Sequence, residues 1–424
     1  MPERVVVTGM GVVAANAHGV DAFEQALREG RSGITFHPKL RDLGFGCQVG
    51  GVPEVSDELK RAYFAEDALR AMNSSMVYAG IAAIDCWRDA GFDLPAPGGS
   101  EVDWDTGAIV GTGIGGVDTV GEYVVPRVNE GKVRRLGSAT VEQTMASSVS
   151  ACIGGLLALG GQVTTNSSAC TTGTEAIVDA FHKIREGRAV RVMAGGAEGS
   201  SHYIWAGFDA MRVLARQSND RPAAASRPMS ATAGGFVPSS GAGLLVLESL
   251  SSARARGARI HAEVLGGHVN CGGQRGGGSM TAPNPEGARR CVLAALASAG
   301  VGARDVDAIN GHLTATMADT LEIATWQRAL GRDPASFPLI NATKSLIGHG
   351  LGAAGGLEAV AVVLQLSRGF VHGSINCEDL HPDLAPYAGS IPRATVAASP
   401  RVIAKASFGF GDVNGCLIFG KWDG

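Results

Sequence analysis

The stretch Thr164–Thr174, TTNSSACTTGT, joins a β-branched run to a helical run and places Cys170 between them. Small residues on both sides of Cys170 predict a tight strand-to-helix turn with the thiol near a helix N-terminus. The helix dipole and the free amides at such a turn favour a thiolate, and a backbone N–H there can stabilise an oxyanion. A lone cysteine is more often a small buried hydrophobe, so Cys170 alone leaves its role open.

The same alternation of strand-like and helical runs extends along the chain and predicts an α/β fold. The strand-like runs lack polar alternation, which is typical of strands buried on both faces of a sheet. Strands are expected over residues 5–9, 108–113, 191–195, 243–248, 260–265, 307–312, 338–341, 401–407 and 416–419. Helices are expected over residues 21–29, 66–89, 141–158, 172–186, 285–298, 319–330 and 351–367.

Length and composition predict a two-part protein. The chain has 424 residues, which exceeds the usual size of one core. The order of elements in the second half repeats that of the first, so we expect an N-terminal unit over residues 1–255 and a C-terminal unit over residues 256–424. The segment 250–259 would be their junction. The loop 270–280, NCGGQRGGGSM, is expected to be flexible and is assigned no chemistry.

Charge and apolar content exclude several functional classes. A net charge of −4 and only 5% aromatic residues argue against nucleic acid as a partner. We see neither a membrane-length apolar run nor a signal peptide, and the eight cysteines lack C-x-x-C spacing. The expectation is a cytoplasmic protein whose cysteines are mostly reduced and buried.

Two further segments carry histidines at turns. His312 ends an apolar strand in NGHLTATMADTLE (310–322), followed by Thr314 and Thr316. Lys344 and His349 lie in NATKSLIGHGLGAAGG (341–356), where glycine and alanine permit close helix packing. Cysteine with histidine is a nucleophile constellation. A metal site is the weaker interpretation, because zinc ligands usually occur in close pairs and these are widely separated.

Two glycine-rich segments leave alternatives open. SFGFGDVNG (407–415) is either a plain hairpin or a turn that presents aromatic rings and amides to a cavity. GTGIGG (111–116) fits G-x-G-x-x-G after a strand, but it lies past residue 100 and precedes a poor helix start. We therefore expect no dinucleotide there.

At this point the residues resemble a known family over nearly the whole chain. The segments are RVVVTGMGVV (4–13), GTGIGG (111–116), SSACTTGTEAI (167–177), AGGAE (194–198), ARARGARIHAEVLG (253–266), ATKSLIGHGLGAAGGLEA (342–359) and SFGFGDVN (407–414). They are similar to the elongating β-ketoacyl-ACP synthases of the thiolase fold, and the spacing in TKSLIGH is the most specific. The resemblance implies duplicated halves in an αβαβα layered sandwich.

The resemblance also implies a reaction and its residues. Cys170 would take an acyl chain from an acyl carrier protein, and His312 and His349 would assist decarboxylation of malonyl-ACP. The carbanion would then attack the acyl group in a Claisen condensation in fatty acid, polyketide or polyene synthesis. Further implied roles are an oxyanion hole from the backbone N–H groups of Cys170 and Phe410, a charge pair of Lys344 with Glu322, pantetheine contacts from Thr314 and Thr316, and an acyl pocket lined by Ile114, Phe208, Phe408 and Phe410.

The resemblance further implies that no metal or other cofactor is needed, since phosphopantetheine arrives on the carrier protein. It implies a homodimer, with a heterodimer as the other arrangement. A silent partner subunit like a chain-length factor is the alternative, but such partners typically lack the nucleophilic cysteine. A degradative thiolase is a second alternative, which would use Cys416 as a base.

The sequence departs from the family pattern at several positions. Leu313 follows the first histidine where the family has glycine, and the stretch between Thr316 and Asp319 is one residue shorter than usual. Asp412 follows SFGFG where glycine is usual, and an unpaired buried carboxylate there would be costly. These departures imply a specialised member of the family.

Overall fold

The computed structural model of the protein describes residues 2–424 and is built on one 11-stranded mixed sheet system. The strands follow one another across it in the order β11-β10-β14-β15-β9-β1-β8-β7-β5-β6, and β2 pairs with β1. Their bounds are β1 (Val5–Ala14), β2 (Ala17–His18), β5 (Thr106–Gly111), β6 (Val163–Thr164), β7 (Arg191–Glu198), β8 (Gly241–Ser249), β9 (Ala262–Cys271), β10 (Ala308–Asn310), β11 (Leu339–Asn341), β14 (Val402–Gly409) and β15 (Val413–Lys421).

The sheet system consists of two halves with the same topology. The halves meet where β1 pairs with β9, over the short register from Val5↔Val264 to Val7↔Ala262. From β1 outward the neighbours are β8, β7, β5 and β6, and from β9 outward they are β15, β14, β10 and β11. If the five main strands of each half are numbered in chain order, leaving out β2, both half-sheets have the order 1-5-4-2-3. Strand directions match as well, which confirms the expected duplication.

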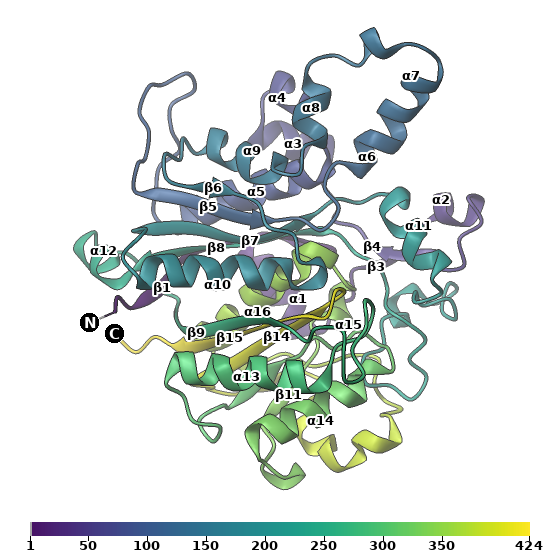
Figure 1. Ribbon diagram of the computed structural model, residues 1–424, viewed down its shortest axis with the longest axis vertical. Coiled ribbons are helices and arrows are strands. Elements are labelled where there is room, and N and C mark those ends of the chain that lie inside the picture. The colour runs from purple at the N-terminus through teal and green to yellow at the C-terminus, as the bar shows by residue number, and fades with distance from the viewer. Residues whose placement is uncertain (1) are drawn as a thin grey trace.

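Helices complete five layers, as Figure 1 shows. The central layer is α10 (Thr172–Arg185) beside α16 (Ala354–Arg368), between the two half-sheets. α5 (Ser74–Asp89) and α9 (Ser148–Leu156) cover one outer face, and α13 (Pro285–Ala299) and α14 (Ala318–Leu330) cover the other. Glycines let the central helices approach closely, since a Cβ at Gly173 would lie 2.6 Å from the backbone nitrogen of Gly356. The αβαβα sandwich is thus confirmed.

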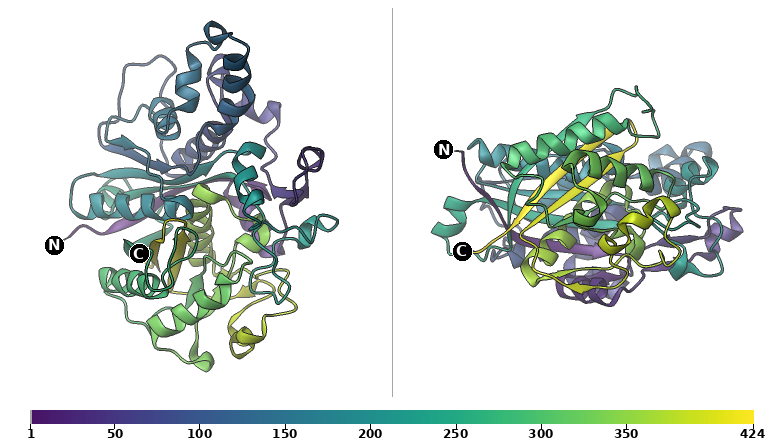
Figure 2. Two further views of the ribbon diagram at one scale, coloured as in Figure 1. Left: turned by 45° about the vertical axis from the view of Figure 1, so that its right-hand side comes forward. Right: turned by 90° about the horizontal axis from the view of Figure 1, so that it is seen from below.

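The remaining elements lie outside these layers. They are α1 (Val20–Glu29), α2 (Pro38–Asp42), α3 (Asp57–Tyr63), α4 (Glu66–Arg70), α11 (His202–Ala210), α12 (Leu250–Ala255), α15 (Lys344–Ile347) and two small two-stranded sheets, β3 (Ile34–Phe36) with β4 (Val49–Gly51) and β12 (Phe370–Val371) with β13 (Val396–Ala397). Between β5 and β6, the helices α6 (Val117–Thr119), α7 (Val125–Asn129) and α8 (Ala139–Thr144) project from the body of the molecule, which Figure 2 shows from a second direction.

Three expected elements differ in the structure. The helix expected over residues 66–89 is two helices, α4 and α5, because the Asn73 side chain accepts from the Met76 amide and caps α5. The helix expected over 141–158 is likewise divided into α8 and α9. The strand expected over 307–312 ends at Asn310, because the amides of His312 and Leu313 turn to the carboxylate of Glu322.

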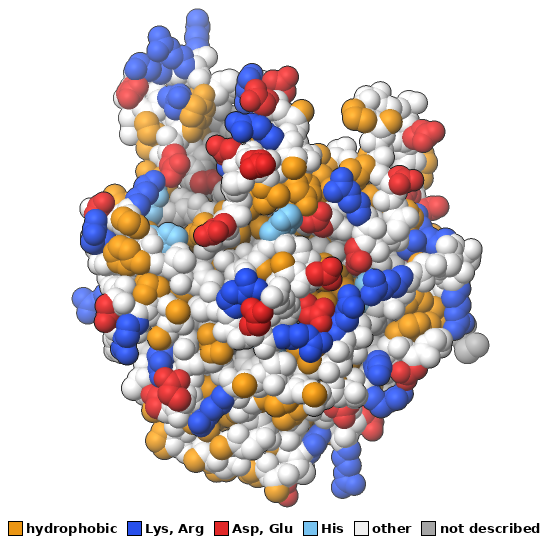
Figure 3. All heavy atoms as spheres, turned by 180° about the vertical axis from the view of Figure 1, so that it is seen from behind, with side chains coloured by type: hydrophobic (Ala, Val, Ile, Leu, Met, Phe, Trp, Pro, Cys, Tyr) orange, Lys and Arg blue, Asp and Glu red, His pale blue; other side chains and the backbone are white. Residues whose placement is uncertain are grey.

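Two further properties concern the helices and the surface charge. Among residues 2–424, none of the helices combines the length and the apolar content that a membrane crossing requires. The face shown in Figure 3 carries acidic and basic side chains intermingled. The mixed surface charge agrees with the small net charge of the sequence, −4.

Candidate active site

Cys170 lies in a single 3-10 turn, Ala169–Thr171, that leads directly into α10. The residue before it, Ala169, has a left-handed backbone with φ of 50°, a conformation that costs a non-glycine residue about 1–3 kcal/mol. This bend places the buried thiol at the N-terminal end of α10 and confirms the strand-to-helix turn expected from the sequence.

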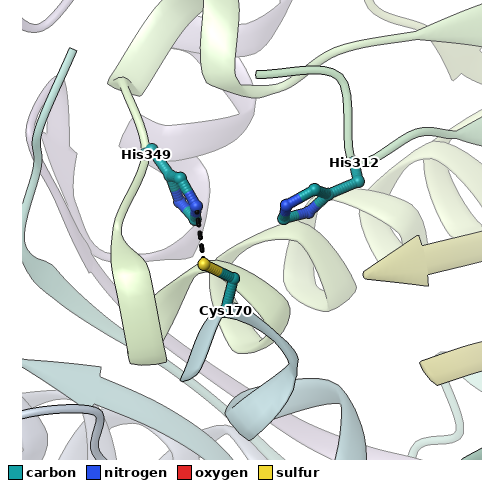
Figure 4. A group of neighbouring side chains, drawn as sticks. All are labelled: Cys170, His312 and His349. Atoms are coloured by element: carbon teal, nitrogen blue, oxygen red, sulfur yellow. Dashed lines mark hydrogen bonds between the residues drawn. The ribbon is translucent and has the colours of Figure 1, made fainter. Parts of the chain in front are cut away.

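The two histidines converge on this thiol from the other half of the molecule, as Figure 4 shows. Nε2 of His349 lies 3.1 Å from Sγ of Cys170. The ring of His312 stands nearly perpendicular to that of His349, with 5.3 Å between the centroids. Residues more than 140 positions apart in the chain thus form one cluster, because α10 and the strand ends of the second half share the centre of the sandwich.

Hydrogen bonds fix the tautomer of both rings. Nδ1 of His349 lies 3.2 Å from the backbone N–H of Leu351, and Nδ1 of His312 lies 3.3 Å from the ammonium of Lys344. A backbone N–H and an ammonium can only donate, so both Nδ1 atoms accept. Each neutral ring therefore carries its proton on Nε2, the His349 Nε2–H donates towards Cys170, and the site holds two donors.

Burial decides the protonation states. It lowers the pKa of both His312 and His349 well below their usual value, and the ammonium of Lys344 lowers it further. Burial also raises the pKa of Cys170 to about 11, although Lys344 and the backbone N–H of Phe410 act in the opposite direction. The resting thiol is therefore neutral, and the thiolate expected from the helix end alone is not supported because burial outweighs it.

Lys344 has a different partner from the expected one. The sequence interpretation paired it with Glu322, but its ammonium bonds the carboxylate of Glu358 on α16. Glu322 instead accepts from the amides of His312 and Leu313, at 2.7 and 2.8 Å. Burial raises the pKa of Glu322 to about 7. The pairing was wrong because the acid that reaches Lys344 depends on how α16 packs, whereas Glu322 braces the backbone of the histidine turn.

A second buried lysine was missed altogether. Lys405 on β14 is fully buried, and its Nζ lies 3.0 Å from Oε2 of the same Glu358. Sequence signals existed for both residues: Glu358 is the one acid in an otherwise apolar helix, and Lys405 is the one cation in an apolar strand. Isolated charges in buried elements are rare unless they are paired.

A cavity of about 380 Å³ opens onto the cluster. Its wall contains most of the expected site residues: Cys170, Phe208, His312, Thr314, Thr316, Glu322, His349, Phe408 and Phe410. The hydroxyls of Thr314 and Thr316 lie 3.0 Å apart. Ile114 stands outside the lining, half-exposed, so its expected part in the acyl pocket receives no support from this cavity. Cys416, the base of the thiolase alternative, is buried on β15 and is likewise absent from the lining.

The GTGIGG turn holds a carboxylate of the protein itself. Glu198 at the end of β7 accepts from the amides of Gly113, Ile114 and Gly352 at 2.9–3.1 Å. The hydroxyl of Thr112 donates to the same carboxylate. The turn therefore ties the first half to the start of α16, and its amides are engaged rather than free for a phosphate.

Asp412 also has the partners that its burial requires. Its side chain is buried and accepts from the amides of Gln274 and Asn284, at 2.8 and 2.7 Å. These bonds attach the loop 270–284 to the turn that carries Phe410, so the loop is fastened by Asp412. Asp412 has a φ of 62°, which aspartate tolerates better than most residues.

A metal ion would find three ligand atoms here, since Cys170, His312 and His349 each offer one within 4.8 Å of the others. The hydrogen bonds oppose that use. A metal-bound histidine usually donates its second ring N–H to an acceptor, whereas here both Nδ1 atoms accept. The site as folded is arranged for donors rather than for a cation.

Sequence comparison places these features in a family. Residues 2–253 match the N-terminal domain model of β-ketoacyl synthases, and residues 261–378 match the C-terminal domain model. The chain is 35% identical to the chloroplastic 3-oxoacyl-[acyl-carrier-protein] synthase I of Arabidopsis thaliana, covering 98% of this chain and 86% of that protein. It is 34% identical to 3-oxoacyl-[acyl-carrier-protein] synthase 1 of Escherichia coli K12, covering 99% of both chains.

Solved structures agree. A β-ketoacyl synthase from Burkholderia phymatum STM815 superposes with a TM-score of 0.90 at 30% identity, over 99% of this chain and all of the other. The ishigamide ketosynthase/chain length factor superposes with a TM-score of 0.89, also at 30% identity, over the whole of both chains. The arrangement of the two halves is therefore that of a known fold, and the chain belongs to the β-ketoacyl synthase family.

Proposed function

We propose that the protein catalyses a decarboxylative Claisen condensation between an acyl chain on Cys170 and malonyl-ACP. The products are a 3-oxoacyl-ACP and CO2. The observation that carries the proposal is the position of Cys170 Sγ, 3.1 Å from a donor nitrogen of His349 and beside a second neutral histidine, at the wall of a cavity.

Acylation would begin with attack by the Cys170 sulfur on the thioester of an acyl-ACP. Because the pKa of the thiol is about 11, the thiol proton leaves during this step and ends on the departing pantetheine sulfur. The amides of Cys170 and Phe410 form the oxyanion hole in this proposal. The Phe410 N–H lowers the pKa of the Cys170 thiol, which supports a position for this amide beside the reacting carbon.

Condensation would use the two Nε2–H donors together. Both hold the thioester oxygen of malonyl-ACP while the carboxylate leaves as CO2, and they stabilise the enolate that results. The enolate carbon attacks the acyl carbonyl, the carbon–sulfur bond to Cys170 breaks, and the thiolate takes up one proton. The positive charge of Lys344 behind His312 favours the negative charge on the enolate.

The surroundings of the cavity suit such substrates. The hydroxyls of Thr314 and Thr316 lie where the amides of a pantetheine arm could bond them. The rings of Phe208 and Phe410 pack with 6.1 Å between centroids, and they offer an apolar wall to an acyl chain. The reaction as proposed requires no prosthetic group, since the pantetheine belongs to the carrier protein.

The proposal extends to partners and pathway. One structural neighbour, 26% identical, is described as a type II PKS acyl-carrier protein in complex with its ketosynthase bound to the hexaketide. By analogy we assign this chain an acyl carrier protein as partner, in polyketide or fatty acid synthesis in the cytoplasm. A homodimer is the expected form, as the resemblance to the family implies. The silent-subunit alternative is disfavoured, because the nucleophile and both histidines are assembled.

One experiment tests the reaction. The protein is incubated with a panel of acyl-ACPs and [2-13C]malonyl-ACP, and intact mass and CO2 release are followed. Acylation at Cys170 and a 3-oxoacyl-ACP product are expected, and Cys170→Ala is expected to abolish chain elongation while leaving the fold intact. A wild-type protein that neither becomes acylated nor elongates any chain would refute the proposal, as would condensation by Cys170→Ala.

A further inference from the structure

A buried group of two lysines and one glutamate lies behind the catalytic cluster. Glu358 is fully buried and is shared between Lys344, which bonds it, and Lys405, whose Nζ lies 3.0 Å from Oε2. The second contact is an ion pair whose angles fall short of a hydrogen bond. With all three groups ionised, the cluster carries one positive charge that no buried acid in it balances.

Retaining that excess charge is costly, which indicates a function. A lone buried ammonium is disfavoured by several kcal/mol unless partners replace its water. Besides Glu358, the partners of Lys405 are two hydroxyls: Oγ1 of Thr174, at 2.7 Å, and Oγ of Ser407. Those hydroxyls also bond each other at 2.8 Å. An apolar side chain at position 405 would leave a simple Lys344–Glu358 pair with no net charge.

Lys405 contacts residues on the elements that carry the groups of the proposed chemistry. Thr174 lies in the first turn of α10, the helix that begins after the nucleophile. Ser407 lies on β14, three residues before Phe410. Glu358 bonds Lys344, and Lys344 in turn approaches Nδ1 of His312 at 3.3 Å. Lys405 therefore contacts the helix that follows Cys170, the strand that leads to Phe410 and, through Glu358, the lysine that bonds His312. Lys405 itself does not line the cavity.

We propose that Lys405 is a second positioning cation of the active site, which shares Glu358 with Lys344 and so leaves Lys344 able to donate to His312. Without it, Glu358 would balance Lys344 alone. With it, a net positive charge stays behind both imidazoles and holds them neutral, with their protons on Nε2. The inference rests on the proposed function only in that those two protons are the donors of the condensation.

The electrostatics supports this arrangement. After burial and Lys344, Lys405 is a further cause that lowers the pKa of both His312 and His349. Burial lowers the pKa of Lys405 itself, and Glu358 opposes that change. The other titratable groups around the cluster are Cys170 before α10, Glu198 on β7, Glu322 on α14, Cys416 on β15 and the buried His372, on whose pKa Glu358 also acts. These carboxylates are occupied by backbone amides, so Glu358 is the acid that contacts the lysines.

Three variants at one position provide the test. Lys405→Met removes the charge at similar size, Lys405→Gln removes the charge but keeps a donor for the hydroxyls, and Lys405→Arg keeps the charge. The readout is the NMR titration of 13C-labelled histidine side chains, assigned with His312→Gln and His349→Gln. It is measured beside the pH profile of kcat/KM for condensation.

In both neutral variants, we expect the histidine titrations and the acidic limb of the pH profile to move up by about one pH unit. The sign follows because a removed positive charge makes imidazole protonation easier. Lys405→Arg is expected to retain the wild-type values. The NMR measurement needs no turnover, so failure of the proposed reaction and failure of this inference are distinguishable.

Two results would overturn the inference. The first is unchanged histidine titrations in the neutral variants, with or without a loss of stability, which would make Lys405 a purely structural residue. The second needs only the wild type: a protonated His312 at pH 6.5 would contradict the charge arrangement even if no neutral variant folds.

Discussion

Replacing the shared carboxylate, Glu358→Gln, tests the buried charge cluster most directly. Glutamine has the shape of glutamate but no charge, so Lys344 and Lys405 would face each other without a counter-charge. Removing one partner of a buried ion pair costs about 3–5 kcal/mol. The upper part of that range is expected here, because two cations lose their acid and neither is exposed to solvent.

The double variant Glu358→Gln with Lys405→Met is the matched control. It again has a single cation and therefore the same net charge as the wild type, so it should be about 2 kcal/mol more stable than Glu358→Gln. Urea unfolding followed by tryptophan fluorescence measures both, because Trp326 is fully buried in the second half. The reasoning fails if Glu358→Gln loses less than about 1 kcal/mol, or if the double variant is the less stable of the two.

The pH dependence of the single variant gives an independent check. Burial already lowers the pKa of Lys405, and loss of Glu358 lowers it further. The unfolded chain then binds more protons than the folded one between that lowered pKa and the usual lysine value. Stability of Glu358→Gln should therefore rise with pH through this window. A flat dependence would mean that loss of Glu358 does not lower the pKa of Lys405, which would contradict the coupling of the two groups.

Two further predictions concern groups outside the catalytic cluster. Burial lowers the pKa of His372 from 6.5 to about 4, so this group should lower the free energy of unfolding by about 3 kcal/mol as the pH falls from 6.5 to 4. His372→Gln should remove that part of the acid dependence from unfolding curves, whereas the part from His312 and His349 should stay. Asp412→Ala would leave the amides of Gln274 and Asn284 without their acceptor and would place alanine at a φ of 62°. We therefore expect the free energy of unfolding to fall by about 2–4 kcal/mol and hydrogen exchange to become faster in the loop 270–284. Unchanged exchange would show that Asp412 does not attach this loop to the turn that carries Phe410.

The sequence predicted most of the elements and the residues that meet in one cluster, Cys170, His312 and His349. Buried strands without polar alternation predicted the α/β layers. The order of elements predicted their duplication, which the resemblance also implied. Cys170, His312 and His349 were identifiable because each stands in a turn of small residues at a strand end. Such turns bring side chains to one edge of a sheet, so local sequence patterns can predict which residues meet at the site.

Pairings across the layers were not predictable in the same way. Lys344 lies in a turn of the second half, and several carboxylates were candidates for its ion pair. Local sequence patterns cannot show which of them packs against it. Glu322 was the acid that the resemblance implied, but α14 directs it to backbone amides. Glu358 was overlooked because it lies inside an apolar helix, where a charge has meaning only once the buried lysines beside it are known.

Leu313 and Asp412 are the departures that distinguish this chain, and the structure changes what they imply. Leu313 has a φ of 20° and packs into the apolar core of the second half, outside the cavity lining. Asp412 fastens a loop and also faces away from the cavity lining. Neither side chain bounds the space for an acyl group, so both set the backbone of the turns that carry His312 and Phe410. The identity of the acyl chain should then depend on the residues that do line the cavity, Phe208, Met211 and Leu321 among them.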